Sequence, residues 1–406
     1  MLEKKRGCMA LQDVSRDVGP PKVAIFNDPK IRGWVYQTVL LVIVVYLAYV
    51  GIENMFDNLR KAHIASGFGF LFDPAGFNIS QKLIPYSEGS SSYLDVYLVG
   101  LANTLLVSIL GVIAATILGF IIGVCRLSTN FVVRGLATTY VEIFRNIPLL
   151  LHIFIWYFGV LRLLPVPRQS VKIGELALLN NRGLFVPKPV FGELFWLTAV
   201  AFVVGVAITV LLARWSSRRQ MRTGQRFPML WPALGLIILL PLVVFAATGS
   251  PLQFDYPKLG TFRPTGGTTV LPELISLLLA LSSYTAAFIA EIVRAGILSV
   301  SKGQTEASYA LGLRARPTLR LVIIPQALRV IIPPLTNQYL NLTKNSSLAV
   351  AIAYPDLVSV FAGTALNQTG QAVEIIMMTM LTYLVISLIT SAGMNWYNNK
   401  MALVER

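Results

Sequence analysis

The sequence has few residues of the kinds that bind metals or form disulfides. It contains only two cysteines, Cys8 and Cys125, and two histidines, His63 and His152, in 406 residues. The cysteines lack the spacing of a metal or redox site, and both fall in segments expected on the reducing cytoplasmic side. The sequence therefore predicts neither a disulfide nor a bound metal.

Charged residues are also scarce. They make up 13% of the chain, whereas 55% of the residues are hydrophobic and the mean hydropathy is +0.66. Soluble domains of this size do not carry so much apolar surface. The composition predicts an all-α polytopic membrane protein.

Catalytic motifs are missing as well. No phosphate-binding GxxxxGK[ST] loop, metal-binding helix or nucleophile elbow occurs in the sequence. A membrane-embedded enzyme would need clustered His, Asp or Glu residues, and we find no such cluster. We therefore expect a transport protein with no catalytic residues and no cofactor of its own. It would be a passive pore, an ion-coupled carrier, or a subunit driven by another polypeptide.

Long apolar runs are what the sequence does have. A helix needs about 20 apolar residues to cross the hydrocarbon. The first 32 residues are charged and lack an apolar core, so they are expected to form a cytoplasmic tail rather than a cleaved signal. Eight spans are predicted, at 33–52, 94–124, 136–161, 191–213, 229–247, 271–293, 330–352 and 375–397.

The basic residues indicate how these spans are oriented. If the N-terminus is inside, 22 Lys and Arg residues fall in internal segments and 10 in external ones, so the positive-inside rule favours N-in and C-in. The basic loop "RWSSRRQMRTGQR" is either a topology anchor or a lipid-binding cluster. Because the basic residues are spread over separate membrane-flanking positions, no nucleic-acid partner is expected.

One polar stretch, "EASYALGLRARPTLRLVIIP", lies between apolar segments and begins at Glu306. Good helix formers run up to Gly312, which is a plausible helix stop. Pro317 and Pro325 are expected to prevent a continuous helix through the region. The stretch predicts a short cytoplasmic helix, a turn and a second element that returns to the membrane. It is either a docking element or an ordinary interfacial loop.

The spacing of this stretch resembles the EAA loop of ABC importer permeases, whose pattern is EAA-x3-G-x9-I-x-L-P. Ser308, Val322 and Ile324 depart mildly from that pattern. In that family the loop is a coupling helix that inserts into a cleft of the cytoplasmic ATPase. The resemblance implies five ATPase-coupling residues here: Glu306, Ala307, Ser308, Gly312 and Pro325.

Further stretches, such as "YVEIFRNIPLLLHIFIWYF" and "NSSLAVAIAYPDL", are similar to the polar-amino-acid branch of these permeases. The predicted arrangement has three spans more than the five-helix core of this branch, and in this it resembles the larger permease of general L-amino-acid systems. The resemblance implies a five-helix permease core, split in two. The expected segments are a tail 1–32, an extra span and loop 33–93, core 94–164, inserted loops and two spans 165–269, core 270–400 with the coupling loop 303–325, and a cytoplasmic tail 401–406.

The same resemblance implies the partners. These are a cytoplasmic ABC ATPase dimer that binds ATP and Mg, a second homologous permease giving a heterodimer, a periplasmic amino-acid-binding protein, and membrane lipid. The chain would translocate polar L-amino acids as a multi-pass protein of the bacterial inner membrane. The competing hypothesis is an ion-coupled secondary amino-acid transporter, which predicts acidic residues deep in the spans; these are scarce.

Polar residues inside the spans are the remaining site candidates. Glu142 with Arg145, and Glu291 with Arg294, are three residues apart and so share a helix face. Each pair is either a cytoplasmic gate or brace, or a neutralised interfacial pair. Lys344 lies inside a span and either lines the substrate pathway or snorkels to the outer rim. The candidate pathway residues are Asn341, Thr343, Lys344, Asn345 and Ser346.

Overall fold

The computed structural model describes residues 29–61, 66–225, 227–260 and 264–401. Most of the two predicted tails lies outside the described residues, which include only residues 29–32 of the N-terminal tail and residue 401 of the C-terminal tail. Cys8 and His63 also lie outside them. The chain divides into two units, Met1–Ser66 and Gly67–Arg406.

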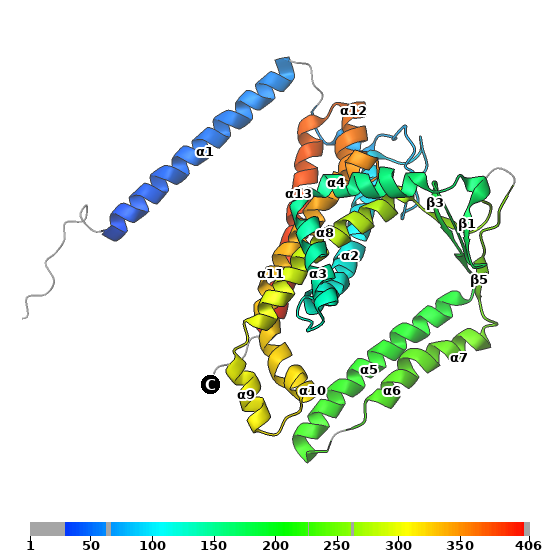
Figure 1. Cartoon of the computed structure of the whole chain (residues 1–406). Helices are drawn as coiled ribbons and strands as arrows, with labels where there is room; N and C mark the ends of the chain where they lie inside the picture. The colour runs from blue at the N-terminus through cyan, green and yellow to red at the C-terminus, as the bar shows by residue number, and fades with distance from the viewer. Residues whose placement is uncertain (1–28, 62–65, 226, 261–263, 402–406) are drawn as a thin grey trace, which may run out of the picture. The chain divides into compact units, whose positions relative to one another are not determined.

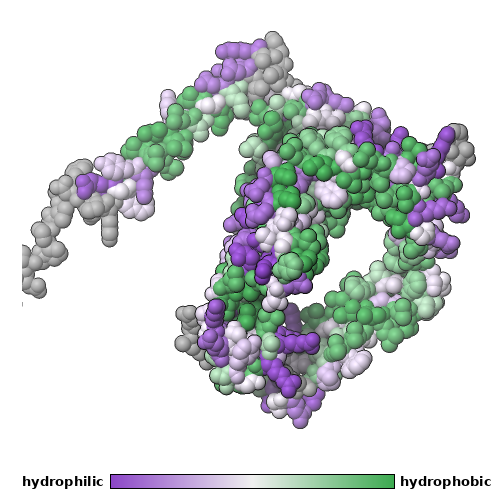
Figure 2. Space-filling view, in the orientation of Figure 1, coloured by the Kyte–Doolittle hydropathy of each residue, from purple (hydrophilic) through white to green (hydrophobic). Residues whose placement is uncertain are grey.

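The described residues of the first unit form one helix, α1 (Pro29–Lys61). Its apolar side chains are exposed almost throughout, and its most apolar stretch is Ile31–Met55. Figure 2 shows hydrophobic surface over the middle of this helix and hydrophilic surface towards its ends. A helix that is apolar on every side is typical of a membrane span. This agrees with the first predicted span.

Four long helices form the bundle of the second unit (Figure 1). They are α2 (Tyr93–Cys125), α8 (Pro272–Leu298), α11 (Ile324–Asn345) and α13 (Ala372–Met401). A turn η2 (Gly69–Phe72) precedes α2, which starts with a capping box between Ser92 and Asp95. The core between α2 and α8 includes Val107, Ala115 and Leu281, all essentially buried.

Glycines on one face of α2 bring it very close to α8. A Cβ at Gly119 would lie 2.6 Å from Cβ of Ile289, and a Cβ at Gly123 would lie 2.8 Å from the carbonyl oxygen of Ala290. Small residues allow this backbone approach in lipid, where helix association depends on packing rather than on water release. The glycine spacing of α2 therefore sets its contact with α8.

The third predicted span, 136–161, is not one straight helix. Instead α3 (Phe131–Asn146) is followed by a second helical run, and the two meet at an angle of 108°. Ile147 is extended at the bend because the ring of the following Pro148 disfavours helical backbone there. The second run consists of α4 (Leu149–Phe154), η3 (Ile155–Val160) and η4 (Leu161–Leu163).

The seventh predicted span, 330–352, begins much earlier than expected. Its helical run consists of α10 (Ala315–Thr318), the π-helical segment η7 (Leu319–Ile323), α11 and the 3-10 segment η8 (Ser346–Ile352). The expectation that Pro325 breaks the helix is wrong. The wider π turn before Pro325 bonds Ile324 to Leu319, so the proline ring enters a turn that is already opened. Pro333 and Pro334 also lie inside α11.

After η8 the chain turns back at Ala353, which has a positive φ of 56°. It then forms the π-helical segment η9 (Val358–Ala365) and α12 (Leu366–Thr369) before α13. The hydroxyl of Tyr93 donates to Gln368 at 2.9 Å, so this turn lies beside the start of α2. In Figure 1, α9 and α10 lie at the other end of the bundle from α12.

The region between the two halves of the bundle contains short strands, which the sequence had not predicted. One antiparallel sheet has the order β1-β2-β3-β6, and a second ladder pairs β4 with β5. The bounds are η5 (Pro167–Gln169), β1 (Val171–Ile173), β2 (Ala177–Asn180), β3 (Gly183–Val186), β4 (Lys188–Phe191), β5 (Leu252–Asp255) and β6 (Thr268–Val270). Open sheet edges are not stable in hydrocarbon, so these strands lie outside the membrane.

The β4–β5 ladder carries a helical hairpin. Its members are α5 (Phe195–Thr223), α6 (Leu230–Leu234), the π-helical segment η6 (Gly235–Leu239) and α7 (Leu240–Ala247). They agree with the fourth and fifth predicted spans. In all, seven helices of the described residues are long and apolar enough to cross a membrane, and the bent α3–η4 pair makes an eighth candidate.

The α2–α8 contact leads to a stability prediction. Gly123→Val should lower the free energy of unfolding by about 1–3 kcal/mol, because the added methyls would clash with α8. The matched control is Gly135→Val, since nothing lies within 4 Å of a Cβ at Gly135. Thermal unfolding of both variants in the same detergent checks this. Equal unfolding midpoints for the two would contradict the close contact.

Candidate coupling site and translocation pathway

Helix α9 (Lys302–Ala310) forms the predicted short helix after α8. Glu306 and Ala307 are exposed on it, and Tyr309 and Leu311 expose 52% and 82% of their surface. Exposed apolar side chains next to a carboxylate give this helix a surface that another protein could cover. Ser308 is different: it is buried, and its hydroxyl donates to the carbonyl of Gln304 at 2.7 Å.

Gly312 ends α9 as predicted. Its φ is +77°, and two hydrogen bonds close the turn in a Schellman motif. The N–H of Gly312 donates to Tyr309 at 2.9 Å, and the N–H of Leu313 donates to Ser308 at 3.1 Å. Since L side chains rarely adopt this backbone region, a glycine is required here. Gly312 thus sets the direction in which the chain leaves α9.

An amide pair that the sequence did not reveal holds α9 to the next span. Nε2 of Gln326 donates to Oε1 of Gln304 at 3.0 Å. Pro325 lies one residue before Gln326, at the start of α11. This hydrogen bond therefore ties α9 to the first turn of α11. The sequence contained no signal for this pair, because 22 residues separate its members.

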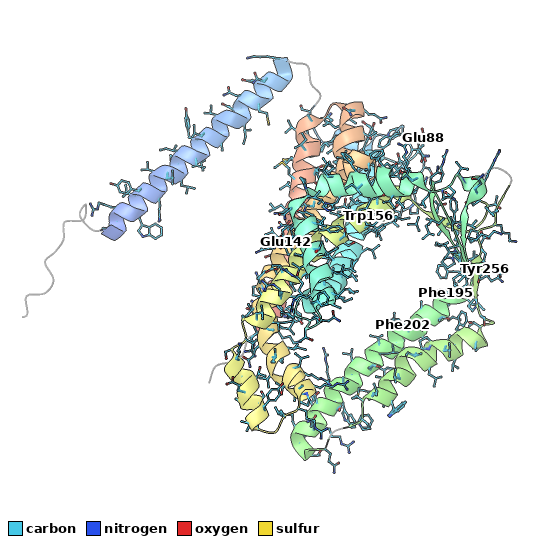
Figure 3. All side chains as sticks on the ribbon, viewed as in Figure 1. Glu88, Glu142, Trp156, Phe195, Phe202 and Tyr256 are labelled. Carbon is cyan, nitrogen blue, oxygen red and sulfur yellow. The ribbon has the colours of Figure 1, made fainter. Side chains whose placement is uncertain are left out.

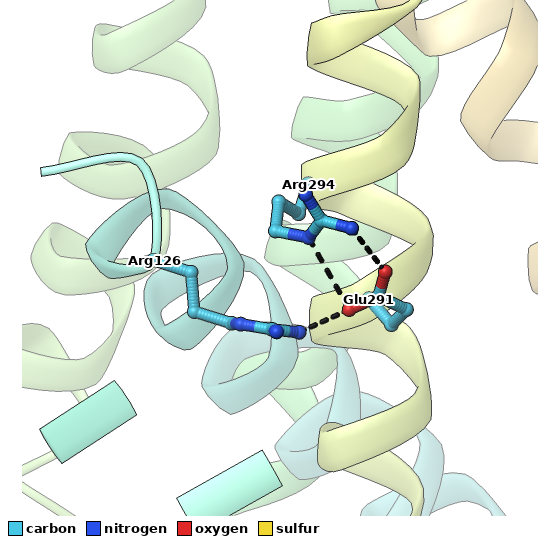
Figure 4. A network of polar contacts seen from close by, with 3 residues as sticks. All are labelled: Arg126, Glu291 and Arg294. Carbon is cyan, nitrogen blue, oxygen red and sulfur yellow. Dashed lines mark hydrogen bonds and ion pairs between the residues drawn. The ribbon is translucent and has the colours of Figure 1, made fainter. Parts of the chain in front are cut away.

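An ion-pair network joins α2 to α8 near the α9 end of the bundle (Figure 4). The carboxylate of Glu291 accepts from Nη2 of Arg294 at 2.6 Å and also from Nη1 of Arg126. The predicted Glu291–Arg294 pair is therefore formed. Arg126, at the end of α2, was missed because its partner is 165 residues away. The side chain of Arg126 is only 10% exposed, so the network clamps the ends of two helices together.

Glu142 and Arg145 do not form the second expected pair. Both are exposed on α3, and within the described part of the chain both ion pairs involve Glu291. The guanidinium of Arg145 instead lies over the ring of Phe288, 5.3 Å from its centroid. This contact replaces the neighbouring carboxylate as the partner of Arg145. Figure 3 labels Glu142 among the side chains of this region.

The candidate pathway residues lie at the end of α11, but they do not converge on one point. Thr343 and Ser346 are buried, and their hydroxyls donate to carbonyls of their own helix, those of Tyr339 and Thr343. Asn341 is exposed and Asn345 is half-buried. Lys344 is exposed and lines a cavity of about 400 Å³ together with residues of α13, among them Tyr383. Of the five, Lys344 alone lines that cavity.

Sequence reasoning missed two buried polar residues, Asp356 and Asn103, which lie beside the turn that follows η8. Asp356 is 1% exposed; its Oδ1 accepts from the N–H of Ser359 at 2.8 Å, and its Oδ2 is buried without a partner in the described structure. Asn103 of α2 is fully buried and donates to the carbonyl of Pro355 at 2.8 Å. The Pro-Asp pair at 355–356 is the signal that could have revealed Asp356, because Asp after a turn commonly caps a helix.

Several known proteins are similar to this chain over most of its length. The family described as binding-protein-dependent transport system inner membrane component matches residues 205–403. The chain is 54% identical to the general L-amino acid transport system permease protein AapQ of Rhizobium johnstonii, over 93% of this chain and 94% of that protein. It is 54% identical to the putative amino-acid ABC transporter permease protein YhdX of Escherichia coli, over 94% and 97%.

A third relative is the glutamate/glutamine/aspartate/asparagine transport system permease protein BztB of Rhodobacter capsulatus. It is 42% identical, and the match covers 95% of this chain and 99% of that protein. Among solved structures, an amino acid ABC transporter with histidines is 20% identical, with a TM-score of 0.45, and the match covers 76% of this chain and 95% of that one.

The clamp on Glu291 gives a second prediction. Glu291→Gln should lower the midpoint of thermal unfolding, because Arg126 and Arg294 would then face each other without a carboxylate between them; the loss is about 1–3 kcal/mol. Glu142→Gln is the same change on an exposed residue without an ion pair and should shift the midpoint little. Similar shifts for both variants would argue against a structural clamp.

Proposed function

Because this chain belongs to the family of binding-protein-dependent transport system inner membrane components, we propose that it is the permease subunit of an ABC importer for polar L-amino acids in the bacterial inner membrane. Relatives at 54% and 42% identity, matched over nearly their whole lengths, carry amino-acid transport in their names. The single structural observation that supports coupling to an ATPase is α9, a short, exposed helix closed by the Schellman turn at Gly312.

The coupling step follows from how α9 is connected. It follows α8 after a break of three residues and is bonded to α11 through Gln304 and Gln326. When a partner ATPase pair binds ATP and closes, a pull on α9 would act on both spans at once. Glu291 ties α8 to α2 at the same end, so the clamp would pass the movement into α2. The exposed Glu306 and Ala307 would contact the ATPase, whereas Ser308 and Pro325 would shape the support behind them.

The complex requires further partners. A second homologous permease would complete the pore as a heterodimer and provide the second coupling loop. A periplasmic amino-acid-binding protein would deliver the substrate to the outer end of the spans. ATP and Mg would bind the ATPase dimer rather than this chain. The substrate would pass the end of α11, where Lys344 supplies a cation beside the cavity that it shares with α13. We expect Asn341, Thr343, Asn345 and Ser346 to border this path.

The turn at Gly312 gives a test of coupling. Gly312→Val should abolish most ATP-driven uptake, because a β-branched residue at a φ of +77° strains the turn and redirects α9. Gly303→Val is the matched control, since Gly303 has no positive φ and the nearest atom to a Cβ there is Oγ of Ser301 at 4.0 Å. Uptake of a labelled amino acid by proteoliposomes that contain the whole complex measures both. Normal uptake by Gly312→Val with its ATPase bound would contradict the docking assignment.

The role of Glu306 is tested separately. Glu306→Ala should reduce co-purification of the ATPase, or leave ATP hydrolysis running without uptake, while the amount of permease in the membrane stays unchanged. Glu175→Ala removes an equally exposed carboxylate from the strand region and should change neither quantity. If Glu306→Ala retained full ATPase binding and full uptake, the carboxylate would have no part in coupling.

A further inference from the structure

A polar cavity at the end of the bundle opposite α9 is not explained by the coupling mechanism. Its volume is about 450 Å³, within the range of small-molecule sites. Five separate parts of the chain line it: the segment before α2, the η3–η4 run, the β2–β3 turn, the start of α8 and the turn after η8. A cavity formed where so many segments meet has a defined shape.

The charged groups on its wall have few partners within the protein. Arg162 and Arg182 both line the cavity, and neither forms an ion pair within the described residues. Arg162 lies over the ring of Phe158, 5.6 Å from its centroid. Guanidinium groups bind carboxylates through paired hydrogen bonds. The wall thus offers two guanidinium groups that have no carboxylate partner among the described residues.

The same wall carries acceptors. Glu273, in the first turn of α8, accepts a hydrogen bond from the hydroxyl of Tyr157 at 2.8 Å through Oε1, and Oε2 has no hydrogen bond within the described structure. Oδ1 of Asn181 is buried and lacks a partner there as well. A buried acceptor without a donor is costly unless a ligand or water supplies one. These oxygens are suited to an ammonium group.

The backbone at the cavity also has an unusual feature. Ala353, on the wall, has a φ of +56° although it is not a glycine, and such strain tends to occur at functional sites. The next residue, Tyr354, is buried and accepts a hydrogen bond from Gln81, which follows Ser80 of the same wall. The cavity therefore borders the turn that ends the seventh span.

We propose that this cavity is an outer binding site for a free acidic amino acid. Arg162 and Arg182 would bind the two carboxylates, and Glu273 with Asn181 would bind the ammonium group. The wall carries a net charge of +1 from these side chains, which matches the charge of −1 on such a ligand. Asn181 and Arg182 form the turn between two strands of a sheet that lies outside the hydrocarbon, where a water-soluble ligand can reach them, so the proposal commits to such a ligand. The inference rests on the proposed amino-acid transport and names a substrate class for it.

The test uses the full-length chain assembled with its partner subunits in phosphatidylcholine nanodiscs, without the soluble binding protein. Calorimetry should show L-glutamate binding that Arg182→Gln weakens at least tenfold. Lys172→Gln, a matched change on an exposed residue of the same sheet that does not line the cavity, should alter it less than twofold. Arg182 and Lys172 are both exposed, so both variants are expected to fold as the wild type does. Equal effects of the two variants would overturn the proposal.

Glutarate has both carboxylates but no ammonium group, so its binding tests the carboxylate-binding groups separately from the ammonium-binding groups. The wild-type complex should bind it at least tenfold more weakly than L-glutamate, and Glu273→Gln should remove that difference. L-glutamine should bind more weakly than L-glutamate. Equal binding of all three, or equal competition by inorganic phosphate, would show a general anion site and overturn the proposal. Loss of glutamate binding in phosphatidylethanolamine nanodiscs would show a headgroup site and would also overturn it.

Uptake distinguishes this inference from the proposed function on which it rests. ATP-driven uptake of L-glutamate into proteoliposomes that is impaired by Arg182→Gln and not by Lys172→Gln supports the site. Uptake that neither variant impairs overturns the site and leaves the permease function intact. Wild-type complex that takes up no amino acid when ATP is supplied would overturn the proposed function itself.

Discussion

The close contact between α2 and α8 is the constraint on which the rest of the bundle depends. At Gly119 and Gly123 the two helices are too close for even one added carbon. In lipid, helices gain little from hiding apolar surface, so such close packing has to hold them together. Once the contact is made, the end of α2 places Arg126 against Glu291 of α8. The clamp thus forms where the glycine spacing brings the two helices together, and it joins α2 to α8 at the α9 end of the bundle.

A helix as short as α9 depends on its attachments to the neighbouring spans. Nine residues make too small a helix to be stable alone. It is held by the Schellman turn at Gly312 and by the Gln304–Gln326 bond. Both lie on the side that leads to α11, whereas Glu306 and Leu311 stay exposed. The helix is therefore fixed to the spans on one side and exposed on the other, which is the arrangement that the proposed coupling role needs.

Sequence reasoning succeeded where a local cause determines the structure. Apolar runs of about 20 residues gave helices, Gly312 gave a left-handed turn, and Glu291 and Arg294, three apart, gave an ion pair. It failed where the interacting residues are far apart in the sequence, and where the same residue type, proline, can either bend a helix or be accommodated in it. Pro148 bent its span and Pro325 did not, because a π turn before Pro325 admits the ring. Arg126 and Gln326 were missed because their partners are far apart in sequence.

The strands after the bent span show how the α5–α7 region is connected to the bundle. β3 pairs with β6, and β4 pairs with β5, so the chain leaves and returns through antiparallel ladders. The α5–α7 hairpin therefore starts and ends at the same place, and α8 begins directly after β6. The pairing of β3 with β6 also fixes the β2–β3 turn beside the start of α8. Arg182, in this turn, therefore lines the same cavity as Glu273. The strand region thus places side chains next to the start of a span.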